Sequence, residues 1–278
     1  MTIREALRAA TARLEQADVP DADVDASYLL ASVLKEDTLA MRINGHRELA
    51  APQRAAFDAL CDRRAAREPL QYILGETEFM GLTFHVEPGV LIPRADTEIL
   101  VEKALAWMKP GARVLDIGTG SGAIAVSLAK LGRPAQVTAV DVSDRALEIA
   151  RQNAERNGAA VEFVKSDCFS ALKGRKYDMI VSNPPYISED EMRGLMPEVT
   201  REPELALFGG ADGLDFYRRI SREAPEYLNE GGCLLFEIGW LQKDAVSALV
   251  KAHIGEPFAL RDYGQNWRVV GAKKEGAC

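Results

Sequence analysis

Apolar positions in the first 67 residues recur at the spacing of amphipathic helices. Turn-forming residues interrupt this pattern at Pro20, at Asn44-Gly45 and at Pro52, where we expect helices to break. The positions that share a helical face are Leu7, Ala10 and Leu14, then Tyr28, Leu29 and Val33, then Phe57, Leu60 and Arg64. The pattern predicts a small all-α bundle over residues 1–70, with no catalytic constellation of its own.

The period changes over residues 77–92, where apolar and polar positions alternate as in β-strands. Two strands around Glu87-Pro88-Gly89 would form a hairpin within a linker of residues 71–97. From residue 98 to 278, helical patterns alternate with short apolar runs, and we expect strands near 112–117, 136–141, 161–165, 177–182, 232–237, 258–262 and 267–271. This alternation predicts an α/β fold with a Rossmann-like, mostly parallel sheet of seven strands and helices on both faces.

A glycine-rich segment follows the first of these strands. Val114–Ile117 leads into Gly118-Thr119-Gly120-Ser121-Gly122 and then into an Ala/Leu-rich helix. Glycines let the chain turn tightly and let backbone groups approach a ligand. Asp141 ends the second strand about 20 residues further on, the usual place of an acid that binds ribose hydroxyls. The spacing is Gly-x-Gly-x-Gly, which differs from that of dinucleotide binders. Glycines that open a helix, together with the acid in place for the ribose, predict an adenosine-type cofactor. Alternatively, Asp141 caps the next helix, although Ser143 suits that role better.

The tetrapeptide Asn183-Pro184-Pro185-Tyr186 directly follows the apolar run 179–181. Each proline lacks an N–H group and favours an extended conformation in the residue before it. The result is a rigid elbow, poor in donors, from which the Asn side chain and backbone carbonyls can accept hydrogen bonds. Such acceptors suit a substrate NH2 group. The structural alternative is a turn that ends the strand.

Several candidate residues stand where parallel strands end. In an open α/β sheet the ligand lies beyond the carboxyl ends of the strands, at the topological switch point. Residues 118–122, Asp141, Asp167 and Asn183 are therefore expected to meet in one crevice. Asp116 could orient the glycine segment or be purely structural, and we interpret Glu237 as structural.

Composition narrows the possible functions. The formal net charge of −8 disfavours sequence-independent nucleic-acid binding, which depends on Lys and Arg. A cluster of Arg63, Arg64 and Arg67 is interpreted as a solvated helix face, and Trp240 and Trp267 as core residues. The four cysteines and three histidines are scattered, so no metal site or disulfide framework is expected. No apolar run is long enough to span a bilayer and the first residues do not resemble a signal peptide, so we expect a cytoplasmic protein without membrane contact.

The motifs together resemble one family, the peptide chain release factor N5-glutamine methyltransferases, a class I S-adenosylmethionine-dependent group. The resemblance covers nearly the whole chain. Besides the glycine segment, Asp141 and the Asn-Pro-Pro-Tyr elbow, it rests on Pro69–Gly75, Glu78–Leu82, Leu91–Arg94 with Thr97-Glu98, and Asp212–Tyr217. One departure is Cys168, which stands where relatives often carry a bulkier residue.

The resemblance implies a role for each matching residue. Residues that would bind S-adenosylmethionine, and its product S-adenosylhomocysteine, are Gly118, Thr119, Gly120, Ser121, Gly122, Asp141, Asp167, Cys168 and Asn183. Asn183, Pro184 and Tyr186 would be catalytic, and with Pro185 they would bind the substrate. The substrate would be the glutamine of the Gly-Gly-Gln motif in class-1 release factors, docked by the helical region. We further expect a monomer without direct nucleic-acid binding.

Four alternatives remain open. A ribosomal-protein glutamine methyltransferase, or a methyltransferase acting on exocyclic amines of nucleic acids, would share the elbow. A nucleotide-cofactor dehydrogenase would use the glycine segment and Asp141 but has no need for two prolines. A binding module without catalysis would rely on the helical region.

Overall fold

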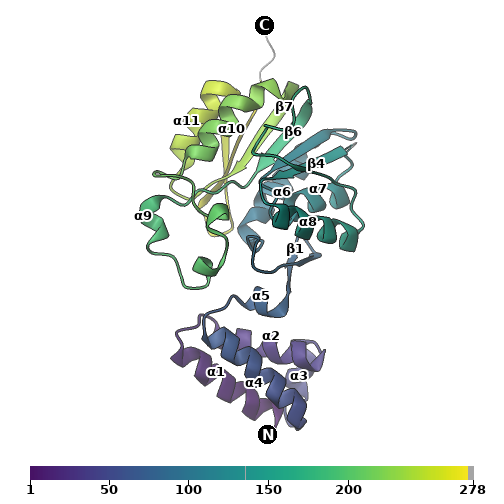
Figure 1. Cartoon of the computed structure of the whole chain (residues 1–278), viewed down its shortest axis with the longest axis vertical. Helices are drawn as coiled ribbons and strands as arrows, with labels where there is room; N and C mark the ends of the chain where they lie inside the picture. The colour runs from purple at the N-terminus through teal and green to yellow at the C-terminus, as the bar shows by residue number, and fades with distance from the viewer. Residues whose placement is uncertain (135, 275–278) are drawn as a thin grey trace. The chain divides into compact units, whose positions relative to one another are not determined.

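A computed structural model describes residues 1–134 and 136–274 (Figure 1). The chain divides into two compact units. The first contains Met1–Glu76 and the separate segment Met196–Arg201; the second contains Thr77–Leu195 and the described residues from Glu202 onward. Each unit has its own hydrophobic core.

The first unit is helical, as the apolar spacing predicts. Its helices are α1 (Ile3–Gln16), α2 (Ala22–Leu34), α3 (Thr38–Ile43), α4 (Ala51–Ala65) and α5 (Leu70–Leu74). Thr2 caps α1 in a reciprocal capping box, in which Glu5 accepts a hydrogen bond from the Thr2 backbone N–H at 2.8 Å. Ala10, Leu14 and Leu29 are buried as expected. Tyr28 is not, because α2 turns Ala26, Leu29 and Leu30 inward and leaves Tyr28 half exposed.

The interpretation of the arginine cluster as a solvated face is wrong for Arg64. Only 4% of Arg64 is exposed, and its guanidinium contacts Asp25 at 2.6 Å and Glu198 at 2.8 Å. Arg67 binds both oxygens of Glu198, each at 2.7 Å. Glu198 belongs to the segment Met196–Arg201, so this buried charge network attaches that segment to the helical unit. Partners far away in the sequence explain why the helical pattern alone could not reveal it.

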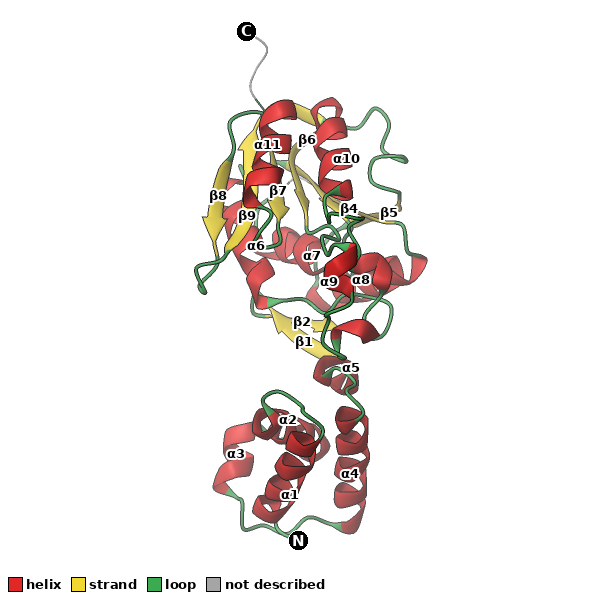
Figure 2. Cartoon of the chain, turned by 90° about the vertical axis from the view of Figure 1, so that its left-hand side faces the viewer, coloured by secondary structure: helices red, strands yellow, loops and turns green. Residues whose placement is uncertain are grey.

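The second unit is built on a seven-stranded sheet, which confirms the predicted fold class (Figure 2). Its strands are β3 (Arg113–Ile117), β4 (Gln136–Asp141), β5 (Glu162–Lys165), β6 (Tyr177–Ser182), β7 (Leu228–Glu237), β8 (Phe258–Arg261) and β9 (Trp267–Lys273). They lie in the order β5-β4-β3-β6-β7-β9-β8, and only β9 runs antiparallel to both of its neighbours. The order reverses between β3 and β6, so a topological switch point lies between their carboxyl ends.

Helices cover both faces of this sheet. The helices α6 (Ala95–Trp107), α7 (Ala123–Leu131) and α8 (Asp144–Asn157) lie on one face, and α10 (Asp215–Glu223) and α11 (Lys243–His253) on the other (Figure 2). Short helical turns complete the second unit: α9 (Glu189–Met192), η2 (Glu204–Ala206) and η3 (Ala224–Glu226). Another short turn, η1 (Val199–Arg201), belongs to the first unit. Two apolar clusters, one on each face, bury the sheet.

A two-stranded sheet precedes the large one, but its turn is not where the sequence analysis placed it. The strands are β1 (Glu76–Phe79) and β2 (Leu82–His85), so the turn is Met80-Gly81 and not Glu87-Pro88-Gly89. Both turn residues have positive φ, 52° and 70°, as the tightest hairpins require. Methionine rarely adopts this conformation, and the pattern therefore gave no signal. Phe79 and Phe84 pack edge to face across the hairpin.

Candidate functional site

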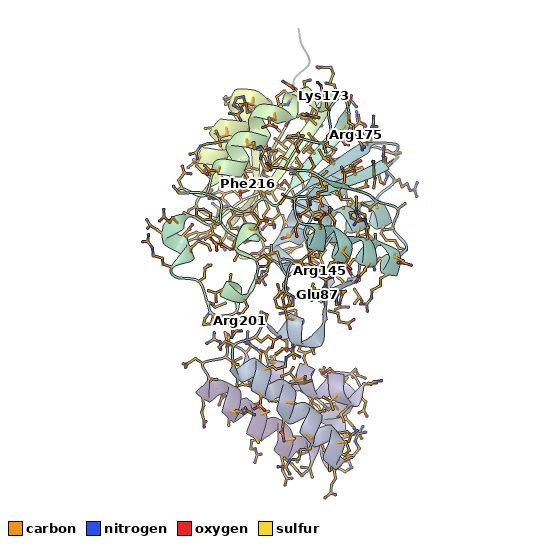
Figure 3. The ribbon with its side chains drawn as sticks, viewed as in Figure 1. Glu87, Arg145, Lys173, Arg175, Arg201 and Phe216 are labelled. Atoms are coloured by element: carbon orange, nitrogen blue, oxygen red, sulfur yellow. The ribbon has the colours of Figure 1, made fainter. Side chains whose placement is uncertain are left out.

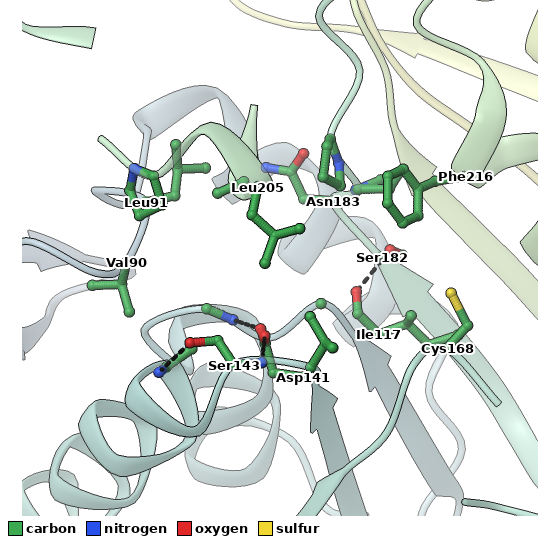
Figure 4. A pocket seen from close by; sticks show the side chains of 18 of the residues that line it. Val90, Leu91, Ile117, Asp141, Ser143, Cys168, Ser182, Asn183, Leu205 and Phe216 are labelled. Atoms are coloured by element: carbon green, nitrogen blue, oxygen red, sulfur yellow. Dashed lines mark hydrogen bonds between the residues drawn. The ribbon is translucent and has the colours of Figure 1, made fainter. Parts of the chain in front are cut away.

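A pocket lies at the carboxyl ends of β3, β4 and β6, at the switch point of the sheet (Figure 4). It brings together eight of the predicted site residues: Gly118, Gly120, Asp141, Asp167, Cys168, Asn183, Pro184 and Pro185. Thr119, Ser121, Gly122 and Tyr186 do not line it. Much of the remaining wall is apolar and includes Val90, Leu91, Leu205, Phe216 and Ile220.

The glycine segment shapes the pocket in two ways. Gly118 and Gly120 have φ of 72° and 54°, and a Cβ added to either would meet no atom within 4 Å. Both line the pocket, so their missing side chains leave room for a ligand. Gly122 differs, because an added Cβ would lie 3.0 Å from the Ala150 Cβ on α8. We therefore assign Gly122 to the packing of α7 against α8.

The backbone N–H groups of this segment are largely used within the protein. Gly118 and Thr119 donate to the Val140 carbonyl at 2.9 and 3.0 Å, and Gly122 donates to the Thr119 carbonyl at 2.8 Å. Gly120 donates to the Asp141 carboxylate at 2.9 Å. The segment thus offers a ligand space and close approach, but few free donors.

Asp116 stabilises the glycine segment from inside the protein. It is fully buried, and its Oδ2 accepts a hydrogen bond from the Thr119 hydroxyl at 2.7 Å. Burial raises the pKa of this carboxyl to about 7, although hydrogen bonds from Thr119 and the Ala125 backbone oppose the rise. Asp116 therefore fills the N-terminal end of α7 from within the protein.

Asp141 faces the pocket from the end of β4. One carboxylate oxygen accepts from the Gly120 N–H and the other from the Ser143 N–H, both at 2.9 Å. Burial raises the pKa of this carboxyl, and the surrounding backbone N–H groups oppose that shift. Ser143 caps α8 by accepting from the Ala146 N–H at 3.2 Å, so Asp141 is free of that task. Its two fixed oxygens retain lone pairs for a diol such as a ribose.

Asp167 and Cys168 form another edge of the pocket. The Asp167 carboxylate is exposed and binds the Arg219 guanidinium at 2.6 Å. Cys168 is buried and its φ is 49°. Burial raises the pKa of its thiol to about 11, so the thiol stays neutral and polarisable beside the ligand space.

The segment that follows β2 forms one side of the pocket, and two acidic residues hold it in place. Glu87 forms an ion pair with Arg145 of α8 (Figure 3). Glu202 is buried, accepts a hydrogen bond from the Ile92 N–H at 2.9 Å and pairs with Arg94. These contacts fix the backbone that carries Val90 and Leu91.

Residues from later in the chain contact the backbone of the Asn-Pro-Pro-Tyr elbow and hold it in place. Gln242, just before α11, donates to the Tyr186 carbonyl at 2.9 Å and accepts from the Gly239 N–H at 3.0 Å. A Cβ at Gly209 would lie 2.6 Å from the Pro185 carbonyl, and one at Gly213 would lie 2.3 Å from the Tyr186 carbonyl. The elbow therefore fits a surface that only glycine backbone can form.

The Asn183 side chain is tied inward by its amide nitrogen, which donates to the Thr97 hydroxyl of α6 at 3.3 Å. Glu237, at the end of β7, is 1% exposed and interacts with both Thr97 and Asn183. Burial raises the pKa of Glu237 to about 7, and the contacts with Thr97, Arg268 and Asn183 oppose the rise. The sequence analysis interpreted Glu237 as structural and did not consider Gln242. The feature of the sequence that points to them is their place at the end of an apolar strand, where Glu237 is the last residue and Gln242 follows shortly after.

Trp240 is not a core residue, because 56% of it is exposed just beyond the end of β7. Trp267 is partly buried against the core and lies under the Arg261 guanidinium. Among the described residues there is no group of three or more His, Cys, Asp or Glu suited to a metal ion. Within the same residues, no helix has both the length and the apolar character needed to cross a bilayer.

Comparison with solved structures supports the fold. A methyltransferase from Pyrococcus furiosus matches with a TM-score of 0.57 and 24% identity, over 71% of this chain and 91% of that one. A 16S rRNA N2 G1207 methyltransferase from T. thermophilus, solved with AdoMet and guanosine, matches with a TM-score of 0.52 and 21% identity, over 72% of this chain and 50% of that one.

Sequence comparison identifies the family to which the chain belongs. Residues 82–201 match the family model of the methyltransferase small domain, and residues 5–75 match that of the PrmC N-terminal domain. The release factor glutamine methyltransferase of Geobacter sulfurreducens is 45% identical over 98% of this chain and 96% of its own length. That of Cereibacter sphaeroides is 44% identical over 100% of both chains. The chain, with its pocket, its glycine segment and its Asn-Pro-Pro-Tyr elbow, belongs to the release factor glutamine methyltransferase family.

Proposed function

We propose that the protein transfers the methyl group of S-adenosylmethionine to the side-chain amide nitrogen of the glutamine in the Gly-Gly-Gln motif of class-1 release factors. The observation that carries this proposal is the Asn183 side chain, which is tied inward by its NH2 group at the edge of the pocket that Asp141 and the glycine segment also line. Its oxygen is thereby left as an acceptor for a substrate NH2 group.

The pocket residues fit this cofactor. Gly118 and Gly120 leave open space, the Asp141 carboxylate offers two acceptors for ribose hydroxyls, and an apolar wall suits an adenine ring. Asp167 and the neutral Cys168 thiol would border the base. Thr119, Ser121 and Gly122 would act by holding the segment in shape.

When bound, the cofactor supplies an activated methyl group, and the protein has to place the amide nitrogen in line with it. An amide nitrogen is a weak nucleophile because its lone pair is delocalised, so positioning can account for roughly 7–11 kcal/mol of the barrier. We propose that the Asn183 side-chain oxygen and the Pro184 carbonyl accept the two amide hydrogens, stabilising positive charge that develops on the nitrogen. Pro185 would keep the elbow rigid, and the Tyr186 ring would pack against the flat amide.

The internal use of backbone donors argues against a dehydrogenase. A dinucleotide needs free N–H groups at the helix N-terminus to bind its pyrophosphate. Here Gly118, Thr119 and Gly120 donate within the protein, and Asp116 fills the end of α7. The same site without a pyrophosphate remains suitable for an adenosine carrying a sulfonium side chain.

The decisive experiment measures transfer of a radiolabelled methyl group to purified class-1 release factors, ribosomal proteins and DNA. We expect label on the release factor alone, and none on a release factor whose Gly-Gly-Gln glutamine is changed to alanine. Asn183→Ala should abolish transfer, whereas Asn266→Ala, at an exposed position between β8 and β9, should not. Labelling of DNA or of a ribosomal protein in preference to the release factor would contradict the proposal.

We further propose that the helical region docks the release factor, that the enzyme works as a monomer without binding nucleic acid directly, and that it acts in the cytoplasm. Deletion of residues 1–76 is a poor test, because Glu198 would lose both Arg64 and Arg67. Charge reversals at exposed positions of the helical unit avoid this. If this region docks the release factor, the charge-reversal variants should have a higher KM for intact release factor than the unmodified chain, and the same rate on a short Gly-Gly-Gln peptide. Equal KM values for intact release factor in the variants and the unmodified chain would contradict docking.

A further inference from the structure

Glu237 lies beside the catalytic elbow although no substrate group needs to reach it. The strands β6 and β7 are parallel neighbours in which Ser182 pairs with Phe236, so Asn183 and Glu237 are the next residues along each strand. Only 1% of Glu237 is exposed, and among the described residues its Oε2 has no hydrogen-bond partner. A buried carboxylate with an unsatisfied oxygen is costly, which points to a role beyond packing.

While Glu237 is ionised, the protons in this cluster favour one arrangement. The Asn183 NH2 group donates to the Thr97 hydroxyl at 3.3 Å, and the Thr97 hydroxyl interacts in turn with the Glu237 carboxylate. An ionised carboxylate only accepts hydrogen bonds, so the single proton of the Thr97 hydroxyl would be directed toward Glu237. Neither group can then donate to the Asn183 oxygen, so a rotated Asn183 amide would place its oxygen against two acceptors.

We propose that Glu237, acting with Thr97, is a positioning residue that fixes the Asn183 amide with its NH2 group inward and its oxygen toward the substrate amide. This inference rests on the proposed role of Asn183. It assigns to Glu237 and Thr97 the task of selecting one of two amide orientations that have almost the same shape. Neither residue has to touch the substrate or the cofactor.

The selection depends on the charge of Glu237. Its pKa is raised to about 7 by burial, with Asp96 of α6 adding to the rise and Arg268 of β9 opposing it. The Tyr217 hydroxyl on α10 donates to the Glu237 backbone carbonyl at 2.9 Å. Tyr217 and Tyr186 both interact electrostatically with Glu237, and both stay protonated because burial raises their pKa. A protonated Glu237 could donate to the Asn183 oxygen and stabilise the rotated amide. The kcat should therefore fall as the pH drops through about 7.

The test is Glu237→Gln, which preserves size but introduces a donor. We expect kcat on intact release factor at pH 8 to fall at least about tenfold, and its decline below pH 7 to disappear. Affinity for S-adenosylmethionine, measured by calorimetry, should stay unchanged because Asp141 and the glycine segment are untouched. Glu102→Gln, at an exposed position of α6, is the matched control and should keep the kcat and the pH profile of the unmodified chain.

A second pair of variants covers the case in which Glu237→Gln does not fold. Thr97→Val removes the hydroxyl and should lower kcat, whereas Thr97→Ser keeps it and should restore most of the rate. Equal losses in both variants, or an unchanged kcat and pH profile in Glu237→Gln, would overturn this inference alone. An unmodified chain that transfers no methyl group to release factors would overturn the proposed function, and this inference with it.

Discussion

The buried charge network of the helical unit gives a prediction whose size follows from the structure. Arg64 and Arg67 lower the pKa of Glu198 to about 2, against a usual value of 4.5 and despite its burial. The Glu198 side chain is 12% exposed, so solvent screens these contacts little. A shift of one pKa unit corresponds to about 1.4 kcal/mol, and the difference between the two values therefore gives about 3 kcal/mol of stabilisation.

Glu198→Gln should remove this stabilisation from the helical unit at neutral pH. Because the folded pKa lies below the unfolded one, the contribution is complete above about pH 4.5 and is lost as the pH falls toward 2. The difference between the variant and the unmodified chain should therefore be the same at pH 7 and pH 6 and should shrink below pH 4.5.

Hydrogen exchange of the α4 amides, followed by mass spectrometry, reports opening of this unit separately from the sheet. A loss of about 3 kcal/mol corresponds to exchange that is faster by a factor on the order of 10². Glu189→Gln, which removes an exposed partner of Arg193, should change stability by less than about 1 kcal/mol. If α4 exchanges at the same rate in Glu198→Gln and in the unmodified chain at pH 7, the network does not stabilise the unit.

Three further predictions concern the pocket and the Asn-Pro-Pro-Tyr elbow. Asp141→Ala should weaken S-adenosylmethionine binding in calorimetry at least tenfold, since hydrogen bonds to a charged group contribute roughly 1.5–3 kcal/mol each. The control Asp144→Ala, at an exposed position, should bind the cofactor normally. Equal affinities of Asp141→Ala and the unmodified chain would show that Asp141 does not bind the cofactor. Gly120→Ala adds the smallest side chain at a φ of 54°, which strains this turn by roughly 1–2 kcal/mol, so it should keep the fold by circular dichroism but bind the cofactor less well because its methyl group enters the pocket; normal binding would contradict that placement. Tyr186→Phe should keep most of the methyl-transfer rate and Tyr186→Ala should lose it, whereas equally inactive variants would assign a role to the hydroxyl.

Most of the fold could be predicted because its signals are local. Apolar runs of the right length marked the seven strands, and the glycine segment and Asp141 marked their carboxyl ends. The hairpin turn was misplaced because Met80 adopts a positive φ that its side chain does not favour. Trp240 was misassigned because a large apolar residue is usually buried, yet here it follows the end of a strand.

The parts of the site that could not be predicted depend on long-range contacts. Thr97, Glu237 and Gln242 meet the elbow from three different elements, and no spacing in the sequence connects them to Asn183 or Tyr186. The burial of Arg64 likewise depends on Glu198, which lies far along the chain. The motifs in the sequence therefore predict residues that line the pocket, whereas contacts between distant elements show which residues hold the elbow in place.

The close fit of glycines around the elbow bears on how enzymes of this kind are recognised and redesigned. Gly209 and Gly213 approach the Pro185 and Tyr186 backbone so closely that no other residue fits without moving the chain. A protein that carries Asn-Pro-Pro-Tyr but larger residues at these two places would have to present the tetrapeptide in another shape. Searching genomes for the four letters alone therefore gathers unlike active sites, whereas adding the two glycines selects for geometry. Grafting the tetrapeptide onto a new scaffold would likewise require glycines at the positions that correspond to Gly209 and Gly213.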